Sequence, residues 1–163
     1  MHTFYNPKKS ALAISISYQR KTGVLEFARS LNPYHKGPIQ KGQQIFDWQN
    51  KLTFTISPEE APKIIKFIRQ PHKDSISFTH APTGNTSEKF SSLLIAGKRP
   101  YINLSLTTQV RGQQKKQITF TLRENETIDE ISIFMQFLHK IIEAPFIEDY
   151  INFAIQKSHQ SRG

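Results

Sequence analysis

The chain has 163 residues, a length that suits one domain with a sizeable core. It contains no cysteine, which excludes disulfide bonds and thiolate metal sites, and no stretch is apolar enough to span a membrane. The N-terminus lacks the long apolar run of a signal peptide. We therefore expect a soluble intracellular protein of the cytoplasm or nucleoid, or of an organelle if this is the mature form of an imported protein.

The formal charge of +9 is distributed unevenly along the chain. Seven basic residues and no acidic residue lie in 89–123, and seven basic residues accompany only Glu26 in 1–46. Residues 124–150 reverse this balance, with seven acidic residues and one basic residue, Lys140. The distribution favours a polyanion that meets the strand regions while the last helix faces elsewhere. A basic surface that only keeps the protein soluble is the alternative.

The first half of the chain predicts three strands and a helix. Alternating apolar and small residues indicate strands at 11–18 and 24–29, which a short turn joins. Residues 32–43 are rich in Pro, Gly and Lys and predict an exposed loop. A third strand at 51–56 then runs into a helix, which Pro71 ends.

Two segments of the chain repeat one pattern. Leu-Thr-Phe-Thr-Ile at 52–56 precedes a Ser-x-x-Glu box at Ser57–Glu60, and Ile-Thr-Phe-Thr-Leu at 118–122 precedes a Thr-x-x-Glu box at Thr127–Glu130. In such a box the hydroxyl caps a helix and the Glu side chain reaches back. We therefore predict two copies of one unit, strands first and a helix last, within one compact fold.

The second copy predicts four strands and a long helix. The expected strands lie at 75–80, 90–96, 101–107 and 116–123. A loop is expected at 81–88 and a basic hairpin loop at 110–116. The helix is expected to start at Thr127 and to kink or end at Pro145, with a continuation over 146–154 as the alternative. Residues 158–163 predict a polar tail.

The last helix is apolar on more than one side. Its main stripe at helical spacing consists of Ile128, Ile131, Phe134, Met135, Leu138, Ile141 and Ile142. Ile133 and Phe137 lie off this stripe, and in water they would add an apolar patch larger than monomers usually tolerate. We therefore expect a subunit interface formed by Ile133, Phe134, Phe137 and Leu138.

Small polar residues stand opposite the inward residues of the predicted strands. The residues of this outer face are Ser15, Ser17, Lys51, Thr53, Thr55, Ser75, Ser77, Thr79, Tyr101, Asn103, Ser105, Thr107, Gln117, Thr119, Thr121 and Arg123. Such a low, hydrogen-bonding floor would admit an extended single strand of nucleic acid, with phosphates on Lys and Arg and bases on aromatic rings. The ordinary preference of Thr for a wet sheet face is the alternative.

Signals for catalysis are poor. The six His residues are scattered without metal-ligand spacing, and the chain has no phosphate-cradling glycine loop or nucleophile elbow. Asp47 stands between Phe46 and Trp48, where we expect it to cap a turn. We therefore predict neither an enzyme nor a bound metal or cofactor. Metal-dependent degradation of an oligonucleotide on incubation would instead favour a nuclease.

One stretch and two shorter strands resemble a known family. Residues 46–57, Phe-Asp-Trp-Gln-Asn-Lys-Leu-Thr-Phe-Thr-Ile-Ser, resemble the Whirly family of single-stranded DNA-binding proteins, which carries Tyr-Asp-Trp-Ser-x-Lys and then an alternating strand. Residues 9–12 resemble the family's Lys-Gly-Lys-Ala-Ala-Leu strand, with Pro7 and Lys8 in place of its first Lys and Gly. Residues 101–106 resemble its aromatic-x-Asn-Leu-Ser-Val strand, and the closing helix also fits.

The resemblance implies an α+β, Whirly-like fold of two antiparallel four-stranded sheets, each followed by a helix, in one nucleic-acid-binding domain of residues 1–157. It also implies a homotetramer with its helices at the centre, which binds single-stranded DNA largely independently of sequence and without catalysis. Such a protein would act in the protection, repair, recombination or transcription of DNA. Kinetoplastid guide-RNA-binding proteins share this fold, so RNA binding or annealing is one alternative. A non-catalytic scaffold for protein partners is another.

The nucleic-acid site is expected to combine cations and aromatic rings. Phosphates are expected on Lys8, Lys9, Arg20, Lys21, Arg29, Lys51, Lys98, Arg99, Arg111, Lys115 and Lys116. Bases are expected to stack on Tyr18, Phe27, Tyr34, Trp48 and Tyr101. For Phe27 and Trp48 a place in the core is an equal alternative, and Tyr18 lies on the apolar face of its strand.

Overall fold

The structure is a computed structural model that describes residues 1–34, 36–81 and 89–160 and, within the last helix, no side chains of 147–153. The strands are β1 (His2–Asn6), β2 (Ser10–Ser17), β3 (Thr22–Arg29), β4 (Leu52–Ile56), β5 (Ser75–His80), β6 (Lys89–Lys98), β7 (Tyr101–Val110) and β8 (Lys116–Arg123). The helices are the short 3₁₀ helix η1 (Trp48–Asn50), α1 (Ala61–Arg69) and α2 (Glu130–Gln160).

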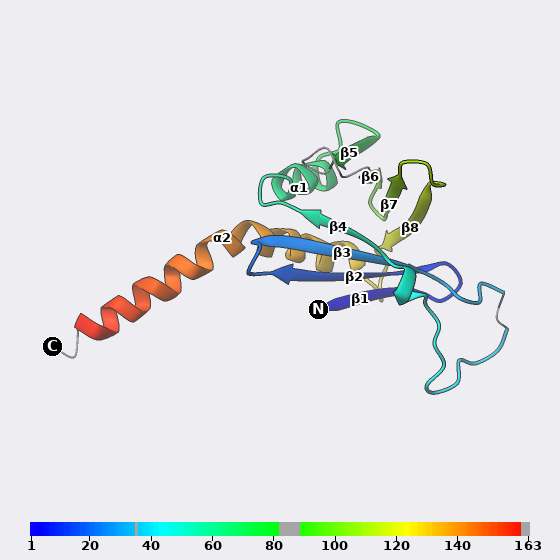
Figure 1. Ribbon diagram of the computed structural model, residues 1–163, viewed down its shortest axis with the longest axis horizontal. Helices are drawn as coiled ribbons and strands as arrows, with labels where there is room; N and C mark the ends of the chain where they lie inside the picture. The colour runs from blue at the N-terminus through cyan, green and yellow to red at the C-terminus, as the bar shows by residue number, and fades with distance from the viewer. Residues whose placement is uncertain (35, 82–88, 161–163) are drawn as a thin grey trace.

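The eight strands form two antiparallel sheets, and a helix follows each sheet (Figure 1). The first sheet has the order β1-β2-β3-β4 and the second has the order β5-β6-β7-β8. This confirms the fold that the resemblance implies. Strand β1 was not predicted, because five residues with one buried side chain, Phe4, show too little alternation to mark a strand.

The core lies between the inner faces of the sheets and the two helices. In the first sheet Phe4, Leu12, Phe27 and Leu52 stand side by side across the four strands, and all are buried. Helix α2 packs on β2, β3, β8 and α1 with its first half. Figure 1 shows its second half leaving the body as a single helix. The two helices thus cover the inner faces of the sheets and leave both outer faces without a helix.

The two sheets are joined through the backbone of the edge strand β8. The hydroxyl of Ser10 donates to the carbonyl oxygen of Thr119 at 2.7 Å, and the guanidinium of Arg29 donates to the carbonyl oxygen of Gln117 at 2.6 Å. Both donors belong to the first sheet, at the start of β2 and the end of β3. These bonds satisfy carbonyl groups that an edge strand would otherwise expose.

The first predicted capping box is confirmed. The N–H of Glu60 donates to the Ser57 hydroxyl at 3.1 Å, and the N–H of Ser57 donates to a Glu60 carboxylate oxygen at 3.0 Å. The other carboxylate oxygen of Glu60 lies 2.9 Å from Nε2 of His80, whose ring stacks on Phe54 with centroids 4.2 Å apart. The cap of α1 is therefore also a link between the two sheets.

The second predicted capping box is wrong. Thr127 donates from its N–H and its hydroxyl to Asn125, and Glu130 accepts from the N–H and the guanidinium of Arg123. The cap is Asp129, whose carboxylate accepts the N–H of Ser132 at 2.9 Å. The helix consequently begins three residues later than predicted, because Glu130 is buried and pairs with strand β8 instead of with its own turn.

Helix α2 also ends later than predicted. It continues through Pro145 to Gln160, so the alternative of a continuation is correct. Residues 158–160, which we assigned to a polar tail, are its last residues, and 161–163 lie outside the described part of the chain. The predicted loop at 82–88 also lies outside the described residues.

The Asp129 cap gives the stability of α2 a dependence on pH. Hydrogen bonds from the Ser132 side chain and backbone lower the pKa of the Asp129 carboxyl below its ordinary value of 3.8. Because the folded pKa is the lower one, the stabilisation is present above pH 3.8 and is lost as the pH falls through the folded pKa. Asp129→Ala should therefore lower the urea midpoint at pH 7 and change it less at pH 3. At pH 7 the urea midpoint of Asp129→Asn, which keeps an acceptor without charge, should lie between the midpoints of the parent protein and of Asp129→Ala. A difference in midpoint between the parent and Asp129→Ala that does not change with pH would contradict this assignment.

Gly23 lets α2 lie directly on the first sheet. A Cβ atom at this position would overlap Cδ1 of Ile141 and would lie 2.7 Å from its Cγ1 and 2.8 Å from Cζ of Phe137. Overpacking of this kind costs about 1–3 kcal/mol, so Gly23→Ala should lower the free energy of unfolding by that amount. Ile141→Ala removes the first two of these contacts, and the double variant should be less destabilised than the sum of the single variants. Additive effects in urea unfolding would mean that α2 does not lie on Gly23.

Candidate nucleic-acid interface

The outer face of the second sheet is an open floor of small polar side chains. One row crosses the four strands as Ser77, Leu94, Ser105 and Thr119. The hydroxyls of Ser105 and Thr119 lie 2.8 Å apart. In neighbouring rows Thr121 donates to Asn103 at 2.6 Å, and the hydroxyls of Thr79 and Ser92 lie 3.3 Å apart. Strands β5 to β8 contain no acidic residue, so nothing on this floor repels a phosphate.

Three large apolar residues rise from this floor. The exposed fraction is 51% for Phe90, 40% for Leu94 and 58% for Tyr101. The register places Tyr101 opposite Lys98 and Arg123 at one end of the sheet, and Phe90 opposite Gln109, beside Lys89, at the other end. Sequence reasoning missed Phe90 and Leu94, because Leu93, Leu94 and Ile95 are consecutive apolar residues that hide the alternation of β6. The signal that could have identified them is that Phe90, Ser92, Leu94 and Ala96 are alternate residues and share one face of β6.

The outer face of the first sheet is partly filled by the chain itself. Phe46 covers the buried Ala11 and Ala28, and its ring stacks on that of Tyr5 with centroids 5.7 Å apart. Trp48 packs against Phe46 at 6.4 Å. Asp47 caps η1 by accepting the N–H of Asn50, as the sequence predicted. This aromatic cluster leaves less room for bases than the floor of the second sheet.

The predicted stacking residues separate into exposed and packed rings. Tyr18, Tyr34 and Tyr101 are exposed, with Tyr34 at 88%. Phe27 is fully buried in the core, so its prediction as a stacking residue is wrong. Its strand alternation places it on the inner face, against the sheet neighbours Leu12 and Leu52. Trp48 is half-buried in the Phe46 cluster.

The predicted phosphate contacts divide into groups at opposite ends of the sheets. Arg29, Lys115 and Lys116 come together in a groove of about 490 Å³, which Asp47 and Asn50 also line. Lys8 and Lys9 lie in the β1–β2 turn beside the end of β3, because the Lys9 carbonyl oxygen accepts the N–H of Ser30. Arg111 begins the β7–β8 turn that leads to Lys115.

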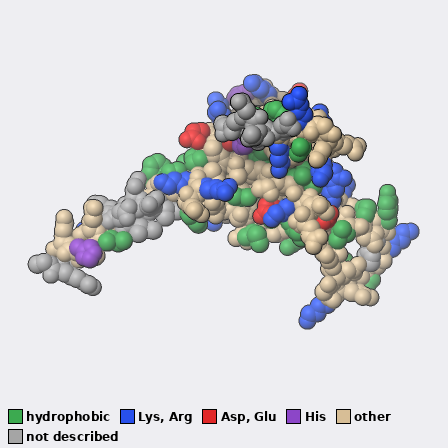
Figure 2. Space-filling view, viewed as in Figure 1, with side chains coloured by type: hydrophobic (Ala, Val, Ile, Leu, Met, Phe, Trp, Pro, Cys, Tyr) green, Lys and Arg blue, Asp and Glu red, His purple; other side chains and the backbone are tan. Residues whose placement is uncertain are grey.

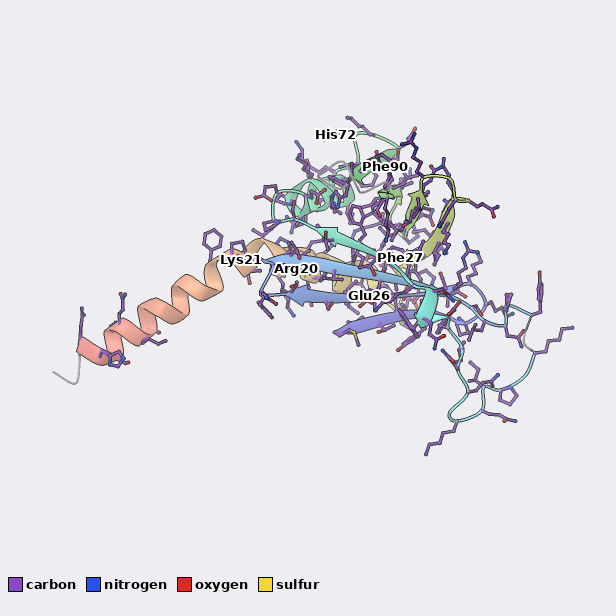
Figure 3. The ribbon with its side chains drawn as sticks, in the orientation of Figure 1. Arg20, Lys21, Glu26, Phe27, His72 and Phe90 are labelled. Atoms are coloured by element: carbon purple, nitrogen blue, oxygen red, sulfur yellow. The ribbon has the colours of Figure 1, made fainter. Side chains whose placement is uncertain are left out.

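Four of the remaining predicted cations lie at the opposite ends of the two sheets, whereas Lys51 stands between Asn50 and Leu52 of that groove. Arg20 and Lys21 occupy the β2–β3 turn, near the point where α2 leaves the body (Figure 3). Lys98 and Arg99 occupy the β6–β7 turn next to Tyr101. The structure therefore does not join all eleven cations into one patch. It offers cations at both ends of the second sheet, which a strand that crosses the sheet would meet in turn.

Lys51 and Arg99, which belong to the predicted phosphate contacts, already pair with carboxylates. Lys51 forms an ion pair with Glu26 on the outer face of the first sheet. Arg99 donates to Glu124 at 2.6 Å. A phosphate at either place would have to compete with an acid, so Lys98 is the better test residue. Figure 2 shows Lys and Arg side chains gathered around the second sheet.

The predicted interface residues of α2 also separate. Phe134 and Leu138 are fully buried, and Phe137 is 5% exposed against β3 and Phe134. Phe137, which we expected at a subunit interface, is instead buried inside the monomer, because Gly23 has no side chain and lets the ring pack on β3. Ile133 is 37% exposed, and Phe146, farther along α2, is 66% exposed.

The described residues show no cluster of three His, Asp or Glu side chains that could hold a metal ion. In the same residues, no helix is long and apolar enough to cross a membrane.

Comparison with known proteins identifies relatives of this fold. The family model described as Whirly transcription factor matches residues 14–131. The crystal structure of WHY3 from Arabidopsis thaliana matches with a TM-score of 0.68 and 14% identity, over 98% of this chain and 95% of that one. The plant transcriptional regulator PBF-2 matches with a TM-score of 0.62 and 17% identity, over 95% and 85%.

A solved structure from another organism has a similar fold at lower sequence identity. The MRP1/MRP2 structure from Trypanosoma brucei has a TM-score of 0.54 and 9% identity, over 91% of this chain and 97% of that one. No curated protein matches the chain. Because the family model covers most of the chain and the two-sheet architecture agrees, this protein belongs to the Whirly family.

Proposed function

We propose that this protein binds single-stranded DNA, largely independently of sequence, along the outer face of its second sheet. The observation that supports this most is the open hydroxyl floor with the exposed Phe90, Leu94 and Tyr101 and with cations at both ends. The nucleic-acid-binding fold of the Whirly family, whose model is described as a transcription factor, supports the same class of function.

The chemistry of the floor suits a single strand better than a duplex. Aromatic rings that stand on a flat sheet offer stacking to unpaired bases, worth about 1–3 kcal/mol per base. A duplex keeps the faces of its bases inside the stack, so it could not stack them on these rings and would meet a flat surface mainly with its sugar-phosphate backbone. Hydroxyl groups both donate and accept hydrogen bonds, so the floor favours no particular base edge. Binding along this face needs no catalysis. The process that such binding would serve is protection, repair, recombination or transcription of DNA, in the cytoplasm, the nucleoid or an organelle.

RNA is the second candidate ligand. The match to the MRP1/MRP2 structure shows a similar fold in another group, and the floor contains acceptors for a 2′-hydroxyl at Ser105 and Asn103. Parallel titrations with DNA and RNA of one sequence decide between the two ligands.

The test is fluorescence anisotropy with a labelled oligothymidine at several salt concentrations. Affinity should fall steeply between about 50 and 200 mM salt, because bound phosphates release counterions. Lys98→Ala should weaken binding to all sequences and reduce the salt slope by about 1. The control is Lys140→Ala, which removes an exposed cation from α2. Absence of binding at low salt, or a clear preference for duplex, would falsify the proposal.

We also propose that α2 assembles the protein into a homotetramer. The second half of α2 extends beyond the sheets (Figure 1), and its described side chains include Phe146 and Ile155, which are 66% and 49% exposed. Together with Ile133 they leave apolar surface that a neighbouring subunit would cover, at about 25 cal/mol per Å² removed from water. A tetramer would set several sheets side by side and raise the effective concentration of sites along one strand.

A further inference from the structure

A second basic region lies on α1 and its connection to β5, beside the edge of the second sheet. Residues 61–73 contain four Lys and Arg residues, His72 and no acidic residue. Arg69 turns toward α2, where it lies 3.3 Å from His139. Lys63, Lys66 and Lys73 are exposed, and none of them pairs with an acid in the described part of the chain. Their charge is therefore available to a partner.

These cations line a groove that runs along a sheet edge. The groove has a volume of about 500 Å³ and lies between α1 and the start of β5, and Figure 3 labels one of its lining residues, His72, at the top of the molecule. Helix α1 contributes Lys63, Lys66 and Phe67, its C-cap Gln70 follows, and β5 contributes Ser75, Ile76 and Ser77. Lys63 and Lys66 are three residues apart on the helix, so their ammonium groups lie on the same side.

The open backbone of β5 completes the groove. Strand β5 is the first strand of its sheet, and among the described strands β6 is its one partner. Within residues 1–34, 36–81 and 89–160, no strand pairs with its other side, and no backbone hydrogen bond outside the β6 ladder involves 75–80. An antiparallel strand directs the N–H and C=O groups of alternate residues away from its partner, so β5 presents a row of unused donors and acceptors.

We propose that this edge binds an extended acidic segment of a partner protein, which adds to the second sheet as a fifth strand beside β5. The main chain of the segment would pair with β5, while its carboxylates would face Lys63 and Lys66. Phe67, at 7% exposure, and the half-buried Ile76 form an apolar base that suits a small aliphatic side chain between two acidic ones. The occupant is thus a strand with alternating acidic and aliphatic residues.

The same observations disfavour nucleic acid in this groove. A single strand gains affinity by stacking bases on exposed rings, and Phe67 is too buried to offer its face. A row of alternating backbone donors and acceptors matches another polypeptide chain, whereas phosphates only accept. An added strand would extend the floor of the second sheet sideways without covering it. The protein could then hold an acidic partner and a nucleic-acid strand at the same time.

The test uses the full chain and a fluorescent peptide, Glu-Val-Glu-Val-Glu-Val-Glu, in an anisotropy titration. The peptide should bind, and its Lys-for-Glu analogue should not. A third peptide with alternate N-methylated backbone groups keeps the charge but cannot complete the ladder, and it should bind at least tenfold more weakly. Equal binding of the N-methylated peptide would reduce the effect to charge attraction and overturn strand addition. So would the absence of any binding by the parent peptide.

Paired charge reversals separate this edge from the nucleic-acid site. Lys63→Glu with Lys66→Glu should weaken peptide binding at least tenfold and leave oligothymidine binding within about twofold. Lys115→Glu with Lys116→Glu, an equal change of charge in the β7–β8 turn, should do the reverse. All four residues are exposed, and unchanged thermal unfolding would show that both variants fold. If the first pair instead weakens oligothymidine as much as the second, the groove belongs to the nucleic-acid path and the proposal is overturned.

Discussion

Phe137→Glu is expected to unfold the domain. The Phe137 ring is 5% exposed and packs against Phe134, with ring centroids 5.8 Å apart, and against the backbone at Gly23. The buried residues around it are apolar, and Lys140, which lines the same cavity one turn along α2, is itself exposed to water. An uncompensated buried charge costs about 3–5 kcal/mol, a large share of the 5–15 kcal/mol that stabilises a typical domain. Circular dichroism with urea unfolding should show loss of most of the cooperative transition.

Ile133→Glu is the matched control on the same helix. Ile133 is one turn away from Phe137 and 37% exposed, so its replacement should change the free energy of unfolding by no more than about 0.5 kcal/mol. If α2 forms the proposed subunit contact, light scattering should nevertheless report smaller particles for this variant. A Phe137→Glu protein that stays fully folded and only dissociates would contradict the packing of α2 on the first sheet.

Thr119→Glu is expected to weaken binding of single-stranded DNA by at least tenfold without unfolding the protein. Thr119 is exposed in the row that Ser77, Leu94 and Ser105 complete, and a carboxylate there would stand in an acid-free floor. Like charges brought together at an interface cost up to several kcal/mol. The effect should be largest at low salt, where repulsion between the carboxylate and phosphates is least screened.

Thr53→Glu makes the same substitution at an exposed position on the outer face of the first sheet. Thr53 stands beside Glu26, which already carries a negative charge and pairs with Lys51. The aromatic cluster around Phe46 occupies the neighbouring surface. This variant should bind oligothymidine within about threefold of the parent. Equal losses in the two variants, measured by anisotropy in one buffer, would assign the strand to both sheets and contradict a site on the second sheet alone.

Local patterns in the sequence were sufficient for most strands and for one helix start. Alternation predicted β4, β5 and β8 within one residue, because inward apolar and outward polar side chains must alternate in a sheet with one wet face. The Ser57–Glu60 capping box was predicted correctly because both of its partners lie within one turn. The repeated strand-and-helix unit followed from these same local signals.

The second helix start shows where local patterns fail. Thr127 and Glu130 have the correct spacing for a box, but Asn125 and Arg123 offer them other partners. Arg123 is the last residue of β8, and its distance from Glu130 depends on how α2 turns back on the sheet. Spacing alone cannot rank a partner within the turn against a partner brought near by the fold.

The sequence by itself determined which residues share a face, where the charge lies and that one unit is repeated. Only the tertiary structure decided which faces are covered. Phe27 is buried, whereas Phe90 is half-exposed, although both are Phe residues in strands of a four-stranded sheet. The physical reason is that the exposure of a residue depends on the element packed above it. Helices α1 and α2 cover the inner faces of the sheets, and Phe46 covers part of the outer face of the first sheet. Within the described residues Phe90 has no such cover.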